Sequence, residues 1–260
     1  MKLSFEKEGI HETKIRRYFD DFEVPAETKP LNKPICIIVF MNRSGSSLIC
    51  ENMRATKKFT GFGEPLNYEL VIKRAQEHDD ITSFPEYLNW LTRKIHKKGT
   101  TFGMKASCDQ VMMLLRSGAI PRYFNDVRWV FIQRKDILSQ AVSFSIAQQT
   151  QQWHSFQSGN ASEARYDFKD IKRRIQTISD TYSSMQAFFS MFDIDPYHIY
   201  YEDFVADTVA GTAKLASYLG VEDVEIDSSR LRMEKQRSGI NKEFRAQFVQ
   251  DFEASLSINK

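Results

Sequence analysis

The chain has 260 residues, and its 36 basic and 34 acidic residues leave a formal net charge of only +2. So small a charge provides no global field for nucleic acid, and no nucleic-acid partner is expected. The hydrophobic fraction of 42%, with 20 Phe and 10 Tyr, is enough for a substantial core.

The three cysteines, Cys36, Cys50 and Cys108, stand far apart in the sequence. They show no spacing typical of a disulfide framework or a metal site, so a reducing compartment is the simplest inference. The N-terminus is too polar for a signal peptide, and no apolar run approaches the length needed to cross a bilayer. These features predict a cytoplasmic protein without membrane insertion and without a bound metal.

Residues 1–30 are polar and charged, and we expect them to form a leader packed onto a single domain over residues 1–260. The rest of the chain alternates short apolar or aromatic runs with helical patterns. The predicted strands are Ile35–Phe40, Thr100–Lys105, Arg128–Gln133 and Tyr197–Tyr201. The predicted helices are Ser47–Lys57, Pro85–His96, Cys108–Arg116, Asp136–Gln149, Asp167–Phe192, Val205–Leu219 and Asn241–Ser255. This order predicts an α/β fold with a central, mainly parallel sheet flanked by helices, in which ligands bind at the carboxyl ends of the strands.

The first strand runs directly into a polar turn, Asn42-Arg-Ser-Gly-Ser-Ser47, after which helical spacing begins. A helix start offers unpaired backbone N–H groups at the positive end of its dipole. Arg43 adds a fixed charge and the serines add hydroxyls, so the turn is suited to phosphate or sulfate. The alternative is an ordinary turn with Ser as N-cap. The G-x-x-x-x-G-K-[ST] pattern of nucleotide-hydrolysing P-loops is missing.

A second candidate is the segment Gly61-Phe-Gly-Glu-Pro65, shortly after the first helix. The proline favours an extended conformation at Glu64, and the glycines permit unusual backbone angles. A carboxylate on such a loop can act as a general base if it points into a site. A surface turn with a solvated Glu is the alternative.

The third candidate follows the strand that ends at Gln133. Asp136 is a suitable N-cap for the next helix, on which Ser139 and Ser143 share one face. Arg134 at the strand end and Ser143 two turns into the helix predict a clamp for a second anion.

The segment Tyr201-Glu-Asp203 comes at the end of the last strand. For Glu202 and Asp203 we favour a structural role, bracing the sheet edge and the next helix. The five histidines show no ligand spacing, and only His154, beside Trp153, is retained as a substrate contact.

Taken together, these segments resemble the sulfotransferases that use 3′-phosphoadenosine-5′-phosphosulfate (PAPS), and among them the bacterial trehalose 2-sulfotransferase family. The match runs in family order from about residue 34 to 254, nearly the whole chain. It rests on Asn42-Arg-Ser-Gly-Ser-Ser-Leu48, Arg54-Ala-Thr56, Gly63-Glu-Pro65, Phe102-Gly-Met-Lys105, Arg134-x-Asp136-x-x-Ser139-Gln-Ala-Val-Ser143, Gln149-Thr150 to Trp153, Tyr201-Glu-Asp203 and Lys235-Gln236.

The resemblance implies a P-loop-like sulfotransferase fold and a role for each matching residue. Arg43, Ser44, Gly45, Ser46 and Ser47 correspond to the loop that holds the 5′-phosphosulfate. Arg134 and Ser143 correspond to the 3′-phosphate contacts, with Ser139 as a second hydroxyl. Lys235, with Arg237 beside it, lies in the segment that closes over the nucleotide, and which of the two reaches the 3′-phosphate stays open. Glu64 corresponds to the base, and Lys105, Trp153 and His154 are candidates for contacts with the acceptor.

The chain departs from the family pattern at several positions. Asn42 and Ser47 replace Gln and Thr, which keeps their polarity, and Lys235 replaces Arg, which loses the bidentate fork. Residues 66–99, expected to shape the acceptor pocket, show no match, so trehalose does not transfer as the substrate.

The predicted activity is transfer of a sulfonate group from PAPS to a hydroxyl of a carbohydrate or small polar metabolite, without a metal. The resembling family includes homodimers, and the helix Asp167–Phe192 could supply an interface or only core. Two alternatives stay open: a nucleotide-dependent phosphotransferase, and a non-catalytic nucleotide-binding relative.

Overall fold

The computed structural model describes residues 7–95, 100–153, 164–232 and 239–257. Five parallel strands form one sheet in the order β2-β3-β1-β4-β5. The strands are β1 Ile35–Phe40, β2 Phe59–Gly61, β3 Thr101–Ser107, β4 Val127–Gln133 and β5 Tyr197–Tyr200. The predicted α/β fold with a central parallel sheet is therefore confirmed.

Strand β1 lies at the centre of the sheet and is buried along its whole length. Its alternate side chains enter two hydrophobic clusters: Ile35, Ile37 and Val39 join the larger one, and Cys36 and Ile38 the smaller one on the other face. This pattern explains why the strand reads as an unbroken apolar run, because a central parallel strand is covered by helices on both faces.

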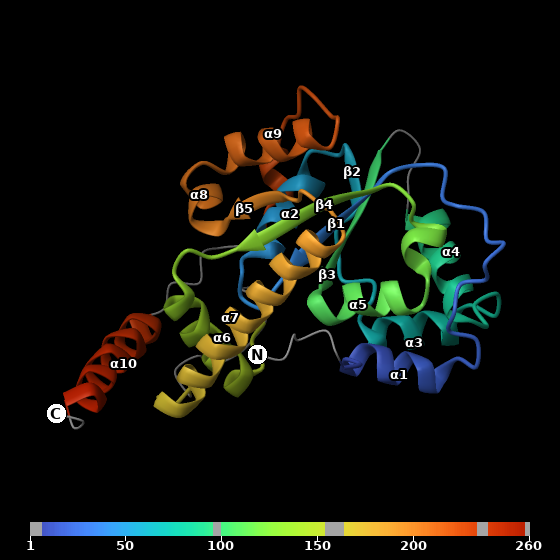
Figure 1. Ribbon diagram of the computed structural model, residues 1–260. Helices are drawn as coiled ribbons and strands as arrows, with labels where there is room; N and C mark the ends of the chain where they lie inside the picture. Colours follow the sequence, from blue (N-terminus) through green and yellow to red (C-terminus); the bar gives the residue numbers. More distant parts are fainter. Residues whose placement is uncertain (1–6, 96–99, 154–163, 233–238, 258–260) are drawn as a thin grey trace.

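The described part of the chain has ten α-helices, which lie on both faces of the sheet, except that α10 packs against α6 and α7 and not on the sheet (Figure 1). Helices α2 and α9 supply the smaller cluster, and α5 and α7 supply much of the larger one on the opposite face. The helices are α1 Ile10–Tyr18, α2 Ser46–Ala55, α3 Tyr68–Glu77, α4 Phe84–Ile95, α5 Cys108–Arg116, α6 Ile137–Thr150, α7 Phe168–Met191, α8 Tyr201–Ala206, α9 Thr208–Tyr218 and α10 Gly239–Ser257.

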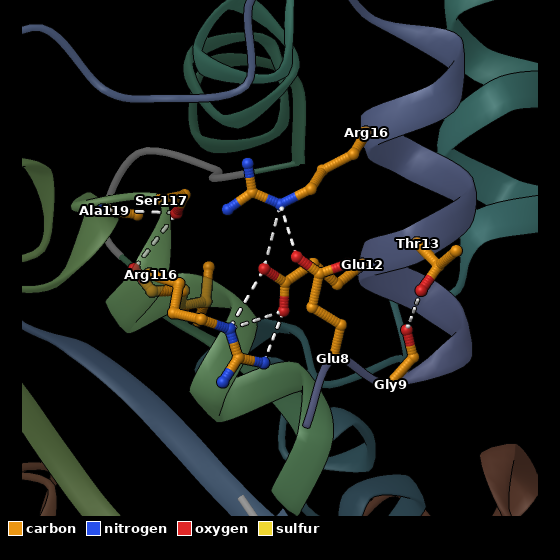
Figure 2. Close-up of polar contacts among 9 residues, drawn as sticks. Glu8, Gly9, Glu12, Thr13, Arg16, Arg116, Ser117 and Ala119 are labelled. Carbon is orange, nitrogen blue, oxygen red and sulfur yellow. Dashed lines mark hydrogen bonds and ion pairs between the residues drawn. The ribbon is translucent and has the colours of Figure 1, made fainter. Parts of the chain in front are cut away.

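Helix α1 lies within the segment predicted as a polar leader and is fastened to α5 by a buried ion-pair cluster (Figure 2). The Glu12 carboxylate is fully buried and accepts hydrogen bonds from Arg16 on its own helix, at 3.0 Å, and from Arg116 on α5, at 2.8 Å. Ile15 on the same helix is also fully buried in the larger cluster. Helix α1 was not predicted because its sequence is mostly polar and only Glu12 and Ile15 are buried.

One predicted helix, Val205–Leu219, is wrong as a single element. The chain breaks at Asp207, whose carboxylate accepts the Ala210 N–H and caps α9 after α8 has ended. A side-chain cap at this position gives the second helix its own start. Strand β2 and helix α3 were also not predicted, since β2 has only three residues and α3 buries only Val71.

All three cysteines are buried and unpaired. Within the described residues, no helix is long and apolar enough to cross a membrane.

Candidate functional site

The loops that follow β1, β3 and β4 meet at the carboxyl edge of the sheet. Strand β1 has β3 on one side and β4 on the other, with Phe40 paired to Ser107 and Val39 to Phe131. The connection after β1 leads to β2 on one side of the sheet, and the connection after β3 crosses to β4 on the other side. This reversal of direction makes the edge a topological switch point, the usual position of a ligand crevice. Two of the segments selected from the sequence, the turn after β1 and the segment after β4, therefore meet in one place.

The turn after β1 leaves the N-terminus of helix α2 without a side-chain cap. Gly45 is the N-cap residue with φ of +88°, and it makes no side-chain capping bond. A Cβ at this position would lie 2.0 Å from the Tyr201 ring, so only glycine fits. The N–H groups of Gly45, Ser46 and Ser47 donate to no acceptor among the described residues. The alternative of an ordinary serine-capped turn is therefore wrong.

The hydroxyl of Ser44 is also suited to an anion. Its side chain is fully buried, and its Oγ has no hydrogen-bond partner within the described chain. Leaving a buried hydroxyl unpaired costs about 1–3 kcal/mol. A phosphate or sulfate oxygen in the turn would remove that cost, so the residues present fit a phosphosulfate group.

Arg43 reaches from the turn to helix α6. Its Nε donates to Ser143 Oγ at 2.9 Å, and one terminal nitrogen donates to the carbonyl oxygen of Trp153 at 2.5 Å. Burial, followed by the nearby positive charge of Arg134, lowers the pKa of Arg43, while Tyr201 acts in the opposite direction. Two cations within each other's field favour a bound anion, which relieves their repulsion.

Arg134 shares this site through Tyr201. Its guanidinium carbon lies 4.8 Å from the centre of the Tyr201 ring, the same ring that covers Gly45, and its Nε lies 3.2 Å from Glu202. Arg43 and Arg134 are therefore neighbours at one edge of the sheet. The structure brings Ser143 to Arg43 and not into direct contact with Arg134.

The other polar residues at the end of β4 hold the backbone. Asp136 caps α6 as predicted, and its carboxylate accepts from both the N–H and the hydroxyl of Ser139, at 2.9 and 2.6 Å. Glu202 accepts the Lys135 N–H at 2.9 Å, and Asp203 pairs with the Lys135 ammonium. The bracing role predicted for the two acidic residues agrees with these bonds.

Gln140, which the sequence analysis named only as part of a motif, connects the turn after β1 with the end of β4. Its side chain is fully buried, donating to the carbonyl oxygen of Asn42 at 3.0 Å and accepting from the Tyr182 hydroxyl at 2.8 Å. The same hydroxyl accepts the N–H of Arg134 at 3.2 Å. The available signal was a glutamine next to the apolar residues Ala141 and Val142 in the same motif.

Lys105, on β3, links the turn to the predicted base. Only 5% of its side chain is exposed, and its ammonium lies 2.7 Å from Glu64 Oε1 and 3.0 Å from Ser47 Oγ. The Ser46 hydroxyl is 3.5 Å away on the same side. Glu64 itself is 37% exposed. The carboxylate and the open helix start are thus joined by one buried cation.

A cavity of about 530 Å³ opens beside Glu64 and Lys105. Its walls come from the outer face of α2, the loop after β2 and the start of α3: Ser47, Cys50, Glu51, Arg54, Phe62, Gly63, Glu64, Asn67, Glu69, Leu70, Lys73 and Lys105. Burial raises the pKa of Cys50 to about 11, against the effect of Lys105 and Arg54. The thiol is therefore protonated near neutral pH and does not serve as a nucleophile.

The ring of Trp153 packs edge-to-face on the ring of Phe144, with 6.1 Å between the ring centres. The carbonyl oxygen of Trp153 accepts a hydrogen bond from Arg43, so the residue helps to hold that guanidinium in place. Three further predicted residues, His154, Lys235 and Arg237, lie outside the described residues. In the described part of the chain, no group of three or more His, Cys, Asp or Glu side chains could hold a metal ion.

A protein-family model described as Stf0 sulphotransferase matches residues 36–251. Two solved sulfotransferase structures are also similar to this chain, at low sequence identity. A sulfotransferase domain from the olefin synthase of Synechococcus PCC 7002 has 13% identity and a TM-score of 0.45, with 88% of this chain and 97% of that one covered. Sulfotransferase STF9 from Mycobacterium avium has 11% identity and a TM-score of 0.43, with 93% and 72% covered. Likenesses this distant carry no further argument, and no curated protein matches the chain.

Proposed function

Since the chain belongs to the Stf0 sulphotransferase family, we propose that this sulfotransferase takes its sulfonate group from PAPS and delivers it to a hydroxyl of a carbohydrate or another small polar metabolite. Stf0 is the trehalose 2-sulfotransferase family, so the family suggested by the motifs is confirmed. The donor, the acceptor class and the residue roles that follow are our proposal, as are the single domain over residues 1–260, the cytoplasmic location and the homodimer.

We assign the donor's anionic groups to the edge formed by the turn and α6. The open N–H groups of residues 45–47, the unpaired Ser44 hydroxyl and Arg43 suit the 5′-phosphosulfate. Arg134 suits the 3′-phosphate because it lies across the Tyr201 ring from the turn. Ser143 would act at the 5′ end of the donor through Arg43, whose guanidinium its hydroxyl contacts from helix α6.

We assign the acceptor to the cavity beside Glu64. The Glu64 carboxylate would take the proton of the acceptor hydroxyl, whose oxygen forms a bond to sulfur. The bond between sulfur and the 5′-phosphate oxygen breaks, and adenosine 3′,5′-bisphosphate leaves. Negative charge then grows on the phosphate, where Arg43, Lys105 and the loop N–H groups can stabilise it.

The observation that carries this proposal is the position of Lys105. Its ammonium contacts the carboxylate of Glu64 and the hydroxyl of Ser47 together, at 2.7 and 3.0 Å. A base and an anion-binding loop that share one buried cation are close enough to act on the same pair of reacting groups.

The test is transfer of radiolabelled sulfate from PAPS to an acceptor panel by the wild type and by Glu64→Gln. We expect Glu64→Gln to lower kcat by about a hundredfold or more while adenosine 3′,5′-bisphosphate binds as before. Transfer at near-normal rates by Glu64→Ala and by Arg43→Ala would overturn the proposal. Nucleotide binding without transfer to any acceptor would instead support a non-catalytic relative.

A phosphotransferase is the remaining alternative. The missing Gly-Lys-[Ser/Thr] pattern speaks against it, because that lysine and hydroxyl hold the phosphates and Mg²⁺ in such enzymes. Greater thermal stabilisation by ATP with Mg²⁺ than by adenosine 3′,5′-bisphosphate would favour it.

A further inference from the structure

The cavity beside Glu64 contains one cation that is bound differently from the others. Arg54, on α2, donates from one terminal nitrogen to the carbonyl oxygen of Phe62 at 2.7 Å. No carboxylate of a described residue lies within 4.0 Å of its guanidinium. In contrast, Lys105 has Glu64 at 2.7 Å and Lys73 has Glu77 at 3.8 Å. Arg54 therefore keeps most of its donors available at the cavity wall.

The acidic residues of the same wall are engaged elsewhere. Glu51 is buried and accepts the Arg232 N–H at 2.9 Å, and Glu69 accepts the Tyr68 hydroxyl at 3.2 Å. Glu64 is paired with Lys105. These carboxylates do not neutralise Arg54, although their charges reduce the positive potential that a ligand would meet.

Arg54 also lies near the loop that carries Glu64, the proposed base. Ser47 and Arg54 line the cavity from α2, with their backbones almost two turns, roughly 10 Å, apart along the helix axis. Because the Arg54 guanidinium reaches the carbonyl oxygen of Phe62, it lies beside the loop that carries Glu64. A cavity of about 530 Å³ has room for a ligand that contacts both Glu64 and Arg54. A hydroxyl held at Glu64 and a second group held at Arg54 would thus belong to one molecule.

We propose, on the basis of the proposed sulfotransfer, that the acceptor carries an anionic group, a phosphate or a carboxylate, which Arg54 binds at the cavity wall beside Glu64. A guanidinium with free donors recognises both groups through paired, charge-assisted hydrogen bonds. Binding there would orient the acceptor so that its hydroxyl points to Glu64.

The test compares acceptors that differ only in charge. Sulfate transfer from PAPS is measured for trehalose against trehalose 6-phosphate, and for glucose against glucose 6-phosphate and glucuronate. We expect a charged acceptor to exceed its neutral partner at least about tenfold in kcat/KM, mainly through KM. The phosphate and carboxylate arms show which of the two anions the site prefers.

The variant Arg54→Gln should bring the ratio of kcat/KM for charged and neutral acceptors close to one. Arg17→Gln, which changes an exposed arginine on α1 outside the cavity, should leave that ratio as in the wild type. Equal transfer to charged and neutral acceptors by the wild type, or an unchanged preference in Arg54→Gln, would overturn the inference. Either result would leave sulfotransfer itself in place, whereas failure of the proposed function would appear as no transfer to any acceptor.

Discussion

Arg43 and Ser143 are a hundred positions apart in the sequence, and the guanidinium of the first donates to the hydroxyl of the second at 2.9 Å. This bond joins the turn after β1 to the middle of helix α6. Changing Ser143 to Ala should weaken binding of adenosine 3′,5′-bisphosphate by about 1 kcal/mol, roughly fivefold, because Arg43 loses an orienting partner. Calorimetric titration of the wild type and the variant measures the difference, and equal affinities would remove Ser143 from the donor site.

Lys105 should be needed for transfer more than for donor binding. Replacing it with Met removes the cation between Glu64 and Ser47, and we expect kcat to fall by about a hundredfold, as when a well-placed charge donor is lost. Lys172→Met, at an exposed position on α7, serves as the matched control. A Lys105→Met enzyme as active as this control would show that the buried lysine has no part in the reaction.

The turn depends on glycine at residue 45. Alanine there would be strained by the positive φ, at roughly 1–3 kcal/mol, and would meet the Tyr201 ring. We expect Gly45→Ala to lower thermal stability and to abolish nucleotide-induced stabilisation. Gly239→Ala is the control, since its Cβ would meet no atom within 4 Å and its φ is not positive. Normal nucleotide binding by Gly45→Ala would contradict the arrangement of the turn.

Glu12 should stabilise the fold without affecting chemistry (Figure 2). Its carboxylate is fully buried between Arg16 and Arg116, so Glu12→Gln leaves two guanidinium groups short of their partner and should lower the free energy of unfolding by about 3 kcal/mol. Glu8→Gln, whose carboxylate is about half exposed and 3.6 Å from Arg16, should change it by less than about 1 kcal/mol. Denaturant titration distinguishes the two, and equal effects would show that burial of Glu12 is unimportant.

The lowered pKa of Glu202 should make the free energy of unfolding depend on pH. Burial alone would raise its pKa, but the Lys135 N–H and Arg134 lower it below the usual value of 4.5. A carboxyl group with a lowered pKa stabilises the fold fully above 4.5 and loses that contribution as the pH falls through its folded pKa. Glu202→Gln should therefore cost about 1 kcal/mol at pH 7, after allowance for solvent screening, and close to nothing at pH 2. A cost that stays constant over this range would exclude the ion pair as its cause.

The sequence was most informative where local chemistry decides the structure. The bounds of β1 could be read directly from Ile35–Phe40, because a fully buried parallel strand is an uninterrupted apolar run. The turn at Gly45 and the N-cap at Asp136 were predictable because both are local backbone features. Glu64 was selected from a short loop and lies at the cavity, although the pattern alone favoured a solvated glutamate in a surface turn and only the family resemblance indicated a base.

Features that depend on distant partners could not be predicted. The burial of Lys105 follows from the packing of β3 between β1 and β2. Its pairing with Glu64 depends on the loop after β2, and β2 was not predicted because it has only three residues. Likewise, the contact of Ser143 with Arg43 in place of Arg134 depends on where α6 lies over the turn. Arg54 was named as part of a family motif, but nothing in the sequence showed that no carboxylate of the described chain lies close to it.

The central claim is that the turn at Arg43 and the residue Arg134 hold the two ends of one adenosine cofactor. Calorimetric titration of the wild type, Arg43→Ala and Arg134→Ala with adenosine 3′,5′-bisphosphate tests it most directly. We predict tight binding to the wild type and a loss of tenfold or more in each variant, as expected when a charged phosphate contact is removed. Unchanged affinity in both variants, or binding of ATP with Mg²⁺ in preference to the bisphosphate, would contradict it.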